Sequence, residues 1–151
     1  MAAEILRPAR PDDREAIERL VEAAYGGYVE RIGRRPAPMD ADYTGLIDGG
    51  HVTVADSDGA VVGVIVLAPM ADHLLVENVA VDPAAQRTGL GRRLMDHAED
   101  EARELGLSEL RLYTNEHMVE NIAWYPRLGY RASERRAEHG FARVFFEKQL
   151  D

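Results

Sequence analysis

The sequence contains no cysteine. This absence excludes a disulfide framework and a cysteine nucleophile, and it suits the cytoplasm, where we expect the protein to reside. Long apolar runs are also missing, because the longest, residues 60–70, is shorter than the roughly 20 residues that a membrane-spanning helix needs. The N-terminus lacks the pattern of a signal peptide, so we expect neither a membrane anchor nor secretion.

Positive charge is scarce as well. Eighteen lysine and arginine residues stand against 27 aspartate and glutamate residues, which gives a net charge of −9. This balance argues against a general nucleic-acid binder and mildly favours cationic ligands, although solubility alone accounts for it. The five histidines show no spacing typical of metal ligands, so no metal site is expected.

The length and the apolar pattern indicate one domain over residues 1–151, long enough for a substantial core. The pattern predicts a strand, two helices, three strands, a helix, a strand, a helix and two strands. The predicted ranges are 4–8, 12–25, 28–32, 51–55, 60–67, 74–81, 92–105, 110–114, 118–128, 130–133 and 142–149. Segment 33–42 is predicted to be a loop, and 43–47 a further helical turn.

Two of these helices carry features that a structure can check directly. Asp12 is predicted to cap the first helix, with Glu15 three residues on as its capping-box partner. The helix from Arg92 is predicted to bury a single stripe formed by Leu94, Met95, Ala98, Ala102 and Leu105.

The most informative stretch is the loop Gln86-Arg87-Thr88-Gly89-Leu90-Gly91, between the strand 74–81 and the helix from Arg92. A loop that feeds a helix N-terminus leaves backbone N–H groups unpaired beside the positive end of the helix dipole. Such an end binds phosphate, and glycines let a ligand approach the backbone closely. Arg87, Arg92 and Arg93 add positive charge. The loop matches neither the dinucleotide-binding G-x-G-x-x-G nor the P-loop, which ends in Gly-Lys-Ser/Thr.

This strand, loop and helix resemble the signature of the GNAT superfamily of acyl-CoA-dependent N-acyltransferases. Gln86, Gly89 and Gly91 match its Gln/Arg-x-x-Gly-x-Gly/Ala pattern, and the predicted element order is similar along nearly the whole chain. The resemblance implies an α/β (α+β) fold, a mixed sheet of about seven strands with helices on both faces, splayed between strands 4 and 5. It also implies that the loop amides bind the pyrophosphate of coenzyme A, with pantetheine along the free edge of strand 4 at 78–81.

A second stretch, 113–130, is similar to the family's Tyr-x-x-x-Gly-Phe/Tyr block, in which the helical tyrosine lies near the thioester sulfur. That tyrosine corresponds to Tyr125. A phenol of pKa about 10 can hydrogen-bond or protonate a leaving thiolate, whose thiol has a pKa of about 8.5, and still be neutral at pH 7. Pro126 departs from the family's pattern and is predicted to kink the helix and shift Tyr125. The cofactor-binding residues implied by the resemblance are Val79, Ala80, Val81, Gln86, Arg87, Thr88, Gly89, Leu90, Gly91, Arg92, Asn121 and Tyr125.

The attacking amine must lose a proton, and Glu77 is the one carboxylate inside the apolar strand 74–81. A carboxylate enclosed by apolar residues is a candidate general base. Facing solvent or a polar neighbour is an equally good account of Glu77. Glu116 and His117, beyond the strand 110–114, are rival bases, and no motif of the family decides among the three.

The resemblance therefore implies an acetyl-CoA-dependent N-acetyltransferase that transfers acetyl directly to a primary amine, with Tyr125 and Glu77 as catalytic residues. Amides near Val79 to Val81 would hold the thioester carbonyl. The expected partners are acetyl-CoA and a small-molecule amine, with no nucleic acid or membrane, and a homodimer is left open. Two alternatives remain: a protein lysine or N-terminal amine as acceptor, and a non-catalytic sensor that binds coenzyme A.

Overall fold

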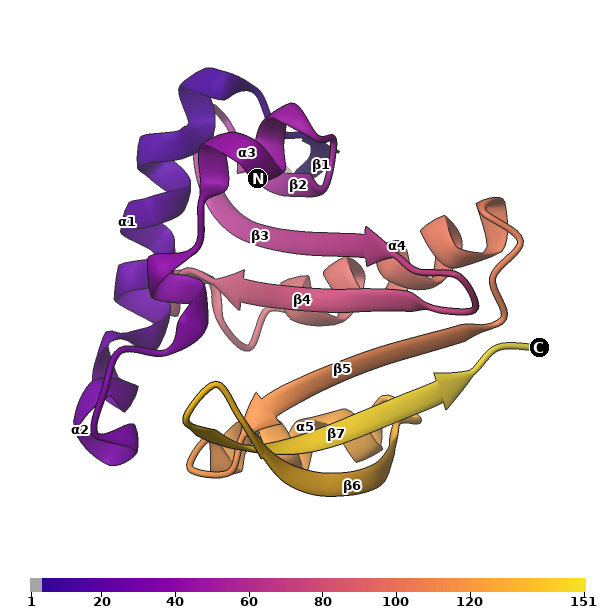
Figure 1. Ribbon diagram of the computed structural model, residues 1–151. Helices are drawn as coiled ribbons and strands as arrows, with labels where there is room; N and C mark the ends of the chain where they lie inside the picture. The colour runs from indigo at the N-terminus through magenta and orange to yellow at the C-terminus, as the bar shows by residue number, and fades with distance from the viewer. Residues whose placement is uncertain (1–3) are drawn as a thin grey trace.

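The computed structural model describes residues 4–151, which form a mixed sheet flanked by helices (Figure 1). The strands are β1 (Ile5–Pro8), β2 (Val52–Ser57), β3 (Ala60–Pro69), β4 (Leu74–Val81), β5 (Glu109–Asn115), β6 (Arg131–Glu138) and β7 (Phe141–Gln149). The helices are α1 (Arg14–Tyr25), α2 (Val29–Ile32), α3 (Tyr43–Asp48), α4 (Leu90–Glu104) and α5 (Val119–Arg127). Short 3₁₀ turns are η1 (Pro11–Asp13), η2 (Gly26–Tyr28), η3 (Ala37–Asp40) and η4 (Pro83–Ala85). The predicted fold class is confirmed.

The seven strands lie in the order β1-β2-β3-β4-β5-β7-β6. All neighbours are antiparallel except β4 and β5, which are parallel because the chain crosses over through α4 between them. The last two strands form a hairpin whose turn, His139-Gly140, has positive φ at both residues, as a tight two-residue turn requires. The crossover through α4 thus creates one parallel pair, β4 and β5, in the middle of the sheet.

Helices cover both faces of the sheet, so there are two apolar cores. One core lies between α1, α3 and the sheet, and includes Ile17, Val21 and Ile47. The other lies between α4, α5 and the sheet, and includes Leu94 and Phe146. The side chains of both cores come from the periodic apolar positions of the helices and strands, which is why the sequence predicts these elements.

The cap position of the first helix lies one residue later than predicted. Asp13 rather than Asp12 precedes α1, and the Asp13 side chain makes no capping hydrogen bond to the helix. Its carboxylate turns back to accept from the backbone N–H of Arg10 at 2.7 Å and from the guanidinium of Arg7 at 2.8 and 3.0 Å. The prediction of an Asp12 cap is therefore wrong, because a buried ion pair between β1 and η1 engages the neighbouring aspartate instead.

Two further predictions need correction. Leu105 is 49% exposed, because α4 ends at Glu104 and the chain turns away, whereas Leu90, placed in the loop by sequence, is buried as the first residue of α4. The predicted loop 33–42 contains one 3₁₀ turn, η3. Proline lies at the start of this turn, where its fixed φ is compatible with the 3₁₀ conformation. The helix starting at Leu90 brings the glycine loop directly onto a helix N-terminus.

Candidate functional site

Strands β4 and β5 pair over a short length and then separate. Their parallel pairing covers only Leu74–Val76 against Leu110–Leu112. Beyond this point the strands diverge toward the end of the molecule where α1 and α2 lie (Figure 1). The edge of β4 from Asn78 onward therefore has no strand beside it on the β5 side, and the splay predicted between strands 4 and 5 is present.

A β-bulge at Glu77 changes which way β4 points its side chains. Val66 pairs with Asn78 and Leu67 with Val76, so Glu77 is left without a partner on β3. In a regular strand, residues 76 and 80 would point to the same face of the sheet, because side chains alternate. With the bulge, Val76 packs in the core under α4, whereas Ala80 packs in the core under α1. The bulge brings Glu77 and Asn78 side by side on the lining of one cavity.

The backbone of β4 has free groups where the strands separate. The N–H of Asp82 donates to the Val62 carbonyl on β3 at 2.9 Å. Because paired and unpaired positions alternate in an antiparallel ladder, Ala80 pairs with β3 while Val79 and Val81 point into the gap. The Val81 carbonyl accepts from the side chain of Gln86 at 3.3 Å, which agrees with this assignment. The amides of Val79 and Val81 are thus available to a ligand.

A cleft of about 640 Å³ runs along this edge. Nine of the predicted cofactor-binding residues line it: Val79, Val81, Gln86, Arg87, Gly89, Gly91, Arg92, Asn121 and Tyr125. The other three do not: Ala80 packs under α1, the Thr88 hydroxyl donates to the Ala85 carbonyl at 2.6 Å, and the Leu90 side chain is buried in the core. Any role of Thr88 and Leu90 in this cleft would therefore come from their backbone amides.

The loop at one end of the cleft has the backbone shape of an anion site. Arg87 and Gly89 have φ of 65° and 88°, in the left-handed region, and α4 starts at Leu90. Alternating left-handed residues at a helix start turn successive N–H groups toward one point, where the helix dipole adds positive potential. A Cβ at Gly89 would meet no atom within 4 Å, so the space beside the loop is open. These residues fit a diphosphate group.

Trp124, which the sequence did not single out, forms part of the wall of the cleft. A Cβ on Gly91 would lie 3.3 Å from two ring atoms of this indole, so Gly91 is small because Trp124 packs on it. On the same cleft the Tyr28 hydroxyl donates to Glu120 at 2.9 Å, and Arg31 pairs with Glu120 at 3.0 Å. These contacts join α2 to α5.

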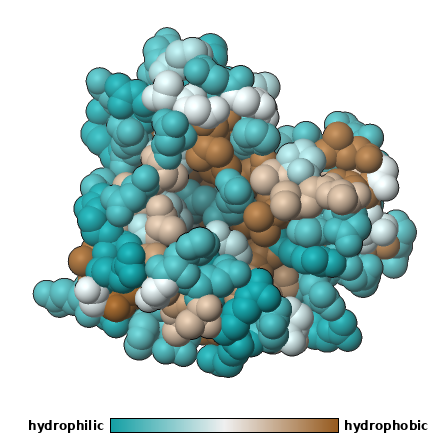
Figure 2. Space-filling view, viewed as in Figure 1, coloured by the Kyte–Doolittle hydropathy of each residue, from teal (hydrophilic) through white to brown (hydrophobic). Residues whose placement is uncertain are grey.

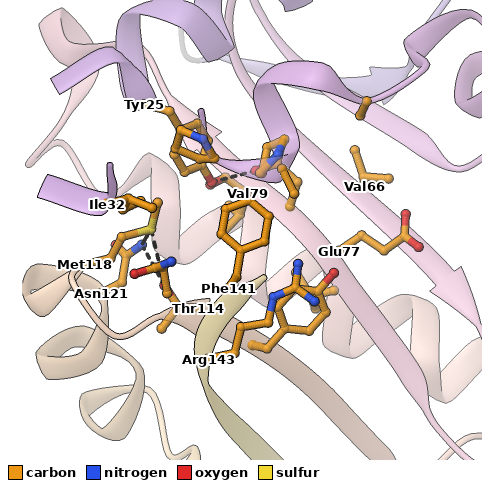
Figure 3. A pocket seen from close by; sticks show the side chains of 18 of the residues that line it. Tyr25, Ile32, Val66, Glu77, Val79, Thr114, Met118, Asn121, Phe141 and Arg143 are labelled. Carbon is orange, nitrogen blue, oxygen red and sulfur yellow. Dashed lines mark hydrogen bonds between the residues drawn. The ribbon is translucent and has the colours of Figure 1, made fainter. Parts of the chain in front are cut away.

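A second cavity, of about 210 Å³, adjoins the cleft. Figure 2 shows a hollow near the centre of this face, bordered by apolar and polar side chains, and Figure 3 shows the cavity from close by. Four residues line both cavities: Tyr25, Val79, Asn121 and Tyr125. A ligand that ends in the cleft would therefore meet a ligand in the cavity at these four residues.

Tyr125 lies at this junction, near the end of α5. Pro126 does not kink the helix in its middle, because α5 ends at Arg127 and the Tyr125 carbonyl accepts from the N–H groups of Leu128 and Tyr130 at 3.0 and 3.1 Å. The ring is buried, and its centroid lies 5.3–5.9 Å from those of three other aromatic rings, Trp124, Tyr130 and Phe146. Its hydroxyl forms no hydrogen bond with a side chain or backbone group of residues 4–151.

Burial raises the pKa of Tyr125 well above the ordinary value of a phenol. The group therefore stays protonated at neutral and moderately alkaline pH. A neutral hydroxyl with an unused proton, at the point where two cavities meet, can donate a hydrogen bond to a developing negative charge.

Tyr25, which the sequence did not single out, lines both cavities. Its hydroxyl lies 2.6 Å from Oδ1 of Asn78 and 3.0 Å from the Val79 carbonyl, and Asn78 in turn donates to Tyr43 at 3.2 Å. Burial raises the pKa of Tyr25, so it too remains neutral. The spacing of Ile17, Val21 and Tyr25, four residues apart on one helix face, indicates burial of Tyr25 and nothing about a cavity.

The three candidate bases are placed very differently. Glu77 is half-buried, lines the second cavity and forms no ion pair among the described residues. Glu116 and His117 are exposed, lie 3.8 Å from each other, and line neither cavity. Of the three, Glu77 is the one positioned to contact a molecule bound in the second cavity.

Within residues 4–151 no three histidine, aspartate or glutamate side chains gather closely enough to hold a metal ion. None of the helices described in that range combines the length and the apolar character needed to cross a membrane.

A sheet opened between two parallel strands, with an anion-binding loop at the opening, is the arrangement that the resemblance implied. The model of the Acetyltransferase (GNAT) family matches residues 14–130 of this chain. The chain therefore belongs to the GNAT family of acetyltransferases. The match spans both the loop 86–91 and the tyrosine helix α5.

Individual relatives extend the comparison. The streptothricin acetyltransferase of Streptomyces lavendulae is 31% identical over 150 residues, which cover 82% of this chain and 79% of that protein. The ribosomal protein bS18-alanine N-acetyltransferase of Escherichia coli (strain K12) is 41% identical over 59 residues, so the chain spans 40% of that protein's length. The IAA acetyltransferase of Azospirillum brasilense is 38% identical over 79 residues, or 52% of that protein.

Solved structures agree on the fold. The PaiA N-acetyltransferase of Thermoplasma acidophilum, in complex with coenzyme A, has a TM-score of 0.83 at 15% identity, covering 99% of this chain and 100% of that chain. The E. coli ribosomal-protein-S18-alanine N-acetyltransferase has a TM-score of 0.78 at 19% identity, covering 97% and 94%. At these identities the likeness concerns the architecture.

Proposed function

We propose that this chain is an acetyl-CoA-dependent N-acetyltransferase that transfers acetyl directly to the primary amine of a small molecule. One observation carries the proposal: the long cleft with the anion-binding loop and the smaller cavity meet at Tyr125, whose hydroxyl is neutral and unpartnered among the described residues. Family membership supports the cofactor. The size of the second cavity, about 210 Å³, supports a small acceptor over a protein segment.

The cofactor is held by backbone more than by side chains. Amides of the first turn of α4 and of the loop before it receive the diphosphate, with Arg87 and Arg92 adding charge beside it. The free N–H groups of Val79 and Val81 would pair with carbonyl oxygens of the pantetheine arm, because the carbonyls of these two residues accept from Tyr25 and Gln86. When bound, acetyl-CoA supplies an acetyl thioester at the junction of the two cavities.

The reaction requires one base and one hydrogen-bond donor. Glu77 accepts a proton from the acceptor's ammonium group, and the freed amine attacks the thioester carbonyl. A β4 amide stabilises the negative charge that grows on the carbonyl oxygen. As the C–N bond forms the C–S bond breaks, Tyr125 donates a hydrogen bond to the leaving sulfur, and the second proton that the nitrogen loses ends on this sulfur. The balance is acetyl thioester plus ammonium giving amide, free thiol and one proton.

Burial of Tyr125 has a consequence for its role. A phenol with a raised pKa is a weaker acid, so full proton transfer to a thiolate is less favourable than in water. The same apolar surroundings disfavour the thiolate, which raises its affinity for a proton in parallel. Tyr125 therefore acts chiefly by hydrogen bonding to the sulfur as charge develops on it.

The test is release of free thiol from acetyl-CoA by the purified protein, with a pool of small primary amines and, separately, with peptides. The proposal expects thiol release with small amines. Release only with peptides would move the acceptor class to proteins. Thermal stabilisation by acetyl-CoA without thiol release in either pool would instead indicate a coenzyme A sensor.

A further inference from the structure

The second cavity contains a buried guanidinium that the reaction scheme leaves unused. Arg143 on β7 lines this cavity and is only 7% exposed. Its Cζ lies 4.3 Å from the ring centroid of Tyr113 and 5.3 Å from that of Phe141, so flat aromatic surfaces hold it in place. Figure 3 shows Arg143 beside Phe141, with Glu77 on β4 at the edge of the same cavity.

The charge of Arg143 is incompletely satisfied by the protein. Its Nη1 donates to Glu138 at 2.9 Å, and this is the one ion pair it forms within residues 4–151. Glu138 is shared, because its other oxygen lies 3.0 Å from Arg136. A guanidinium has five N–H donors, and the bond to Glu138 is the one hydrogen bond that the Arg143 side chain donates within residues 4–151, so most of its donors are unused. A charge this deeply buried is costly unless a partner binds it.

Glu77 and Arg143 are the two charged residues among those that line the cavity. The rest of the lining is apolar or uncharged, including Ile32, Pro36 and Leu46 from the α2–α3 region. One carboxylate and one guanidinium in an otherwise uncharged space match a ligand that carries one charge of each sign. These local charges guide the choice of ligand more directly than the net charge of −9, which alone favours a cationic acceptor.

We infer that the acceptor is an amine that also carries a carboxylate, an amino acid in the broad sense, with its carboxylate bound by Arg143 and its amine facing Glu77. This inference rests on the proposed acetyl transfer. A planar guanidinium with free parallel donors binds a carboxylate through two hydrogen bonds, which fixes the orientation of the molecule. Arg143 is then a specificity-determining residue that contacts the acceptor away from the reacting atoms.

The test is a matched comparison of acceptors. Thiol release at saturating acetyl-CoA is measured with α-, β- and γ-amino acids, with the carboxamide of each, and with peptides that begin with the same residues. Wild type should show kcat/KM about 10- to 100-fold higher for the best amino acid than for its carboxamide, the range of a hydrogen bond to a charged group. R143M should bring this ratio close to one, and R143K should leave an intermediate ratio.

The matched control is R34M. Arg34 stacks on Phe141, with Cζ 4.1 Å from the ring centroid, but does not line the cavity, so its loss removes the same charge nearby and should keep the wild-type ratio. The thermal shift with acetyl-CoA shows that each variant is folded and binds the cofactor. The assay distinguishes a failure of this inference from a failure of the proposed function. Carboxamides or peptides acetylated as well as amino acids, or an unchanged ratio in R143M, overturn this inference alone, whereas no thiol release with any acceptor overturns the acetyltransferase proposal as well.

Discussion

The two cavities that meet at Tyr125 are built in different ways. The cleft that would hold the cofactor takes seven of its fifteen lining residues from one stretch, Val79 to Arg92, where a strand edge and a helix start present backbone amides. The second cavity, where the acceptor would bind, is lined by side chains from segments between Tyr25 and Arg143, more than a hundred residues apart. Backbone groups serve a ligand that stays the same across a family, whereas dispersed side chains can be exchanged one at a time to change the acceptor.

The largest expected effect lies at the junction. Tyr125→Phe keeps the ring and removes the hydroxyl, so acetyl-CoA affinity and melting temperature should hardly move while kcat falls by about 10²–10⁴, the usual contribution of a positioned proton donor. Because burial raises the pKa of Tyr125, the wild-type enzyme should show no basic limb from this group up to about pH 9. Steady-state thiol release across pH 6–9 measures both.

Tyr130→Phe is the matched control for that variant. The Tyr130 hydroxyl is buried without a partner in residues 4–151, and the residue packs against Tyr125 but lines neither cavity. Its removal should leave turnover unchanged and keep or raise the melting temperature, since a buried unpaired hydroxyl is costly. Equal losses of activity in the two variants would mean that the aromatic cluster, and not the Tyr125 hydroxyl, supports catalysis.

In the second cavity, Glu77→Gln should lower kcat/KM for the amine by about 10²–10⁴, because it removes the proposed base. Acetyl-CoA binding should be unaffected, because Glu77 lines the acceptor cavity and not the cofactor cleft. The fall in rate toward acidic pH should also flatten in this variant, whereas Tyr125→Phe should keep it. A wild-type rate and pH profile in Glu77→Gln would mean that the base is a group outside the second cavity, such as Glu116 or His117.

On the cofactor side alone, Gly89→Val should remove the anion site. Both Gly89 and Gly106 have positive φ with open space around the Cβ position, and they lie at opposite ends of α4, so Gly106→Val imposes the same kind of backbone strain away from the cleft. Acetyl-CoA at a hundred times its dissociation constant should stabilise wild type and Gly106→Val by about 2.7 kcal/mol and Gly89→Val by much less. A full thermal shift in Gly89→Val would place the diphosphate elsewhere.

The smallest effect is expected outside both cavities. Asp13→Asn breaks the buried contacts with Arg7 and should cost about 1–3 kcal/mol of unfolding free energy at pH 7, whereas Asp12→Asn, on the surface, should change it by less than about 0.5. Activity per folded molecule should stay at the wild-type level in both. Denaturant unfolding gives the free energies.

This stability difference should depend on pH in one direction. The hydrogen bond from Arg7 is the main reason that the pKa of Asp13 lies below its usual range, with burial opposing it. A lowered carboxyl pKa stabilises the fold above the unfolded value of about 3.9 and ceases to do so as the pH falls through the folded value. The gap between wild type and Asp13→Asn should therefore be constant near neutrality and shrink below about pH 4. A gap that grows in acid would contradict the ion pair.

The same contrast explains what could be predicted from the sequence. The strand 74–81, the loop and the following helix are local, so hydrophobic period and glycine chemistry predicted them together with a phosphate site, and the family resemblance implied coenzyme A as the ligand. Tyr25 and Arg143 gain their roles through segments distant in sequence, and nothing around either residue indicates a cavity. The bulge at Glu77, which aims that side chain, also leaves no local signal. The predicted helix ends at Asp12 and Leu105 were each wrong by one residue, because tertiary contacts set helix ends.

The most direct test of the central claim is the first turnover. Wild type, Tyr125→Phe and Tyr130→Phe are mixed with saturating acetyl-CoA and an excess of acceptor, and thiol release is followed before the steady state, so that product release cannot hide the chemical step. We expect a first-turnover rate at least about a hundredfold lower in Tyr125→Phe, with wild-type behaviour in Tyr130→Phe and unchanged acetyl-CoA affinity in both. A wild-type first turnover in Tyr125→Phe would contradict this expectation and leave Tyr125 as a packing residue between the two cavities.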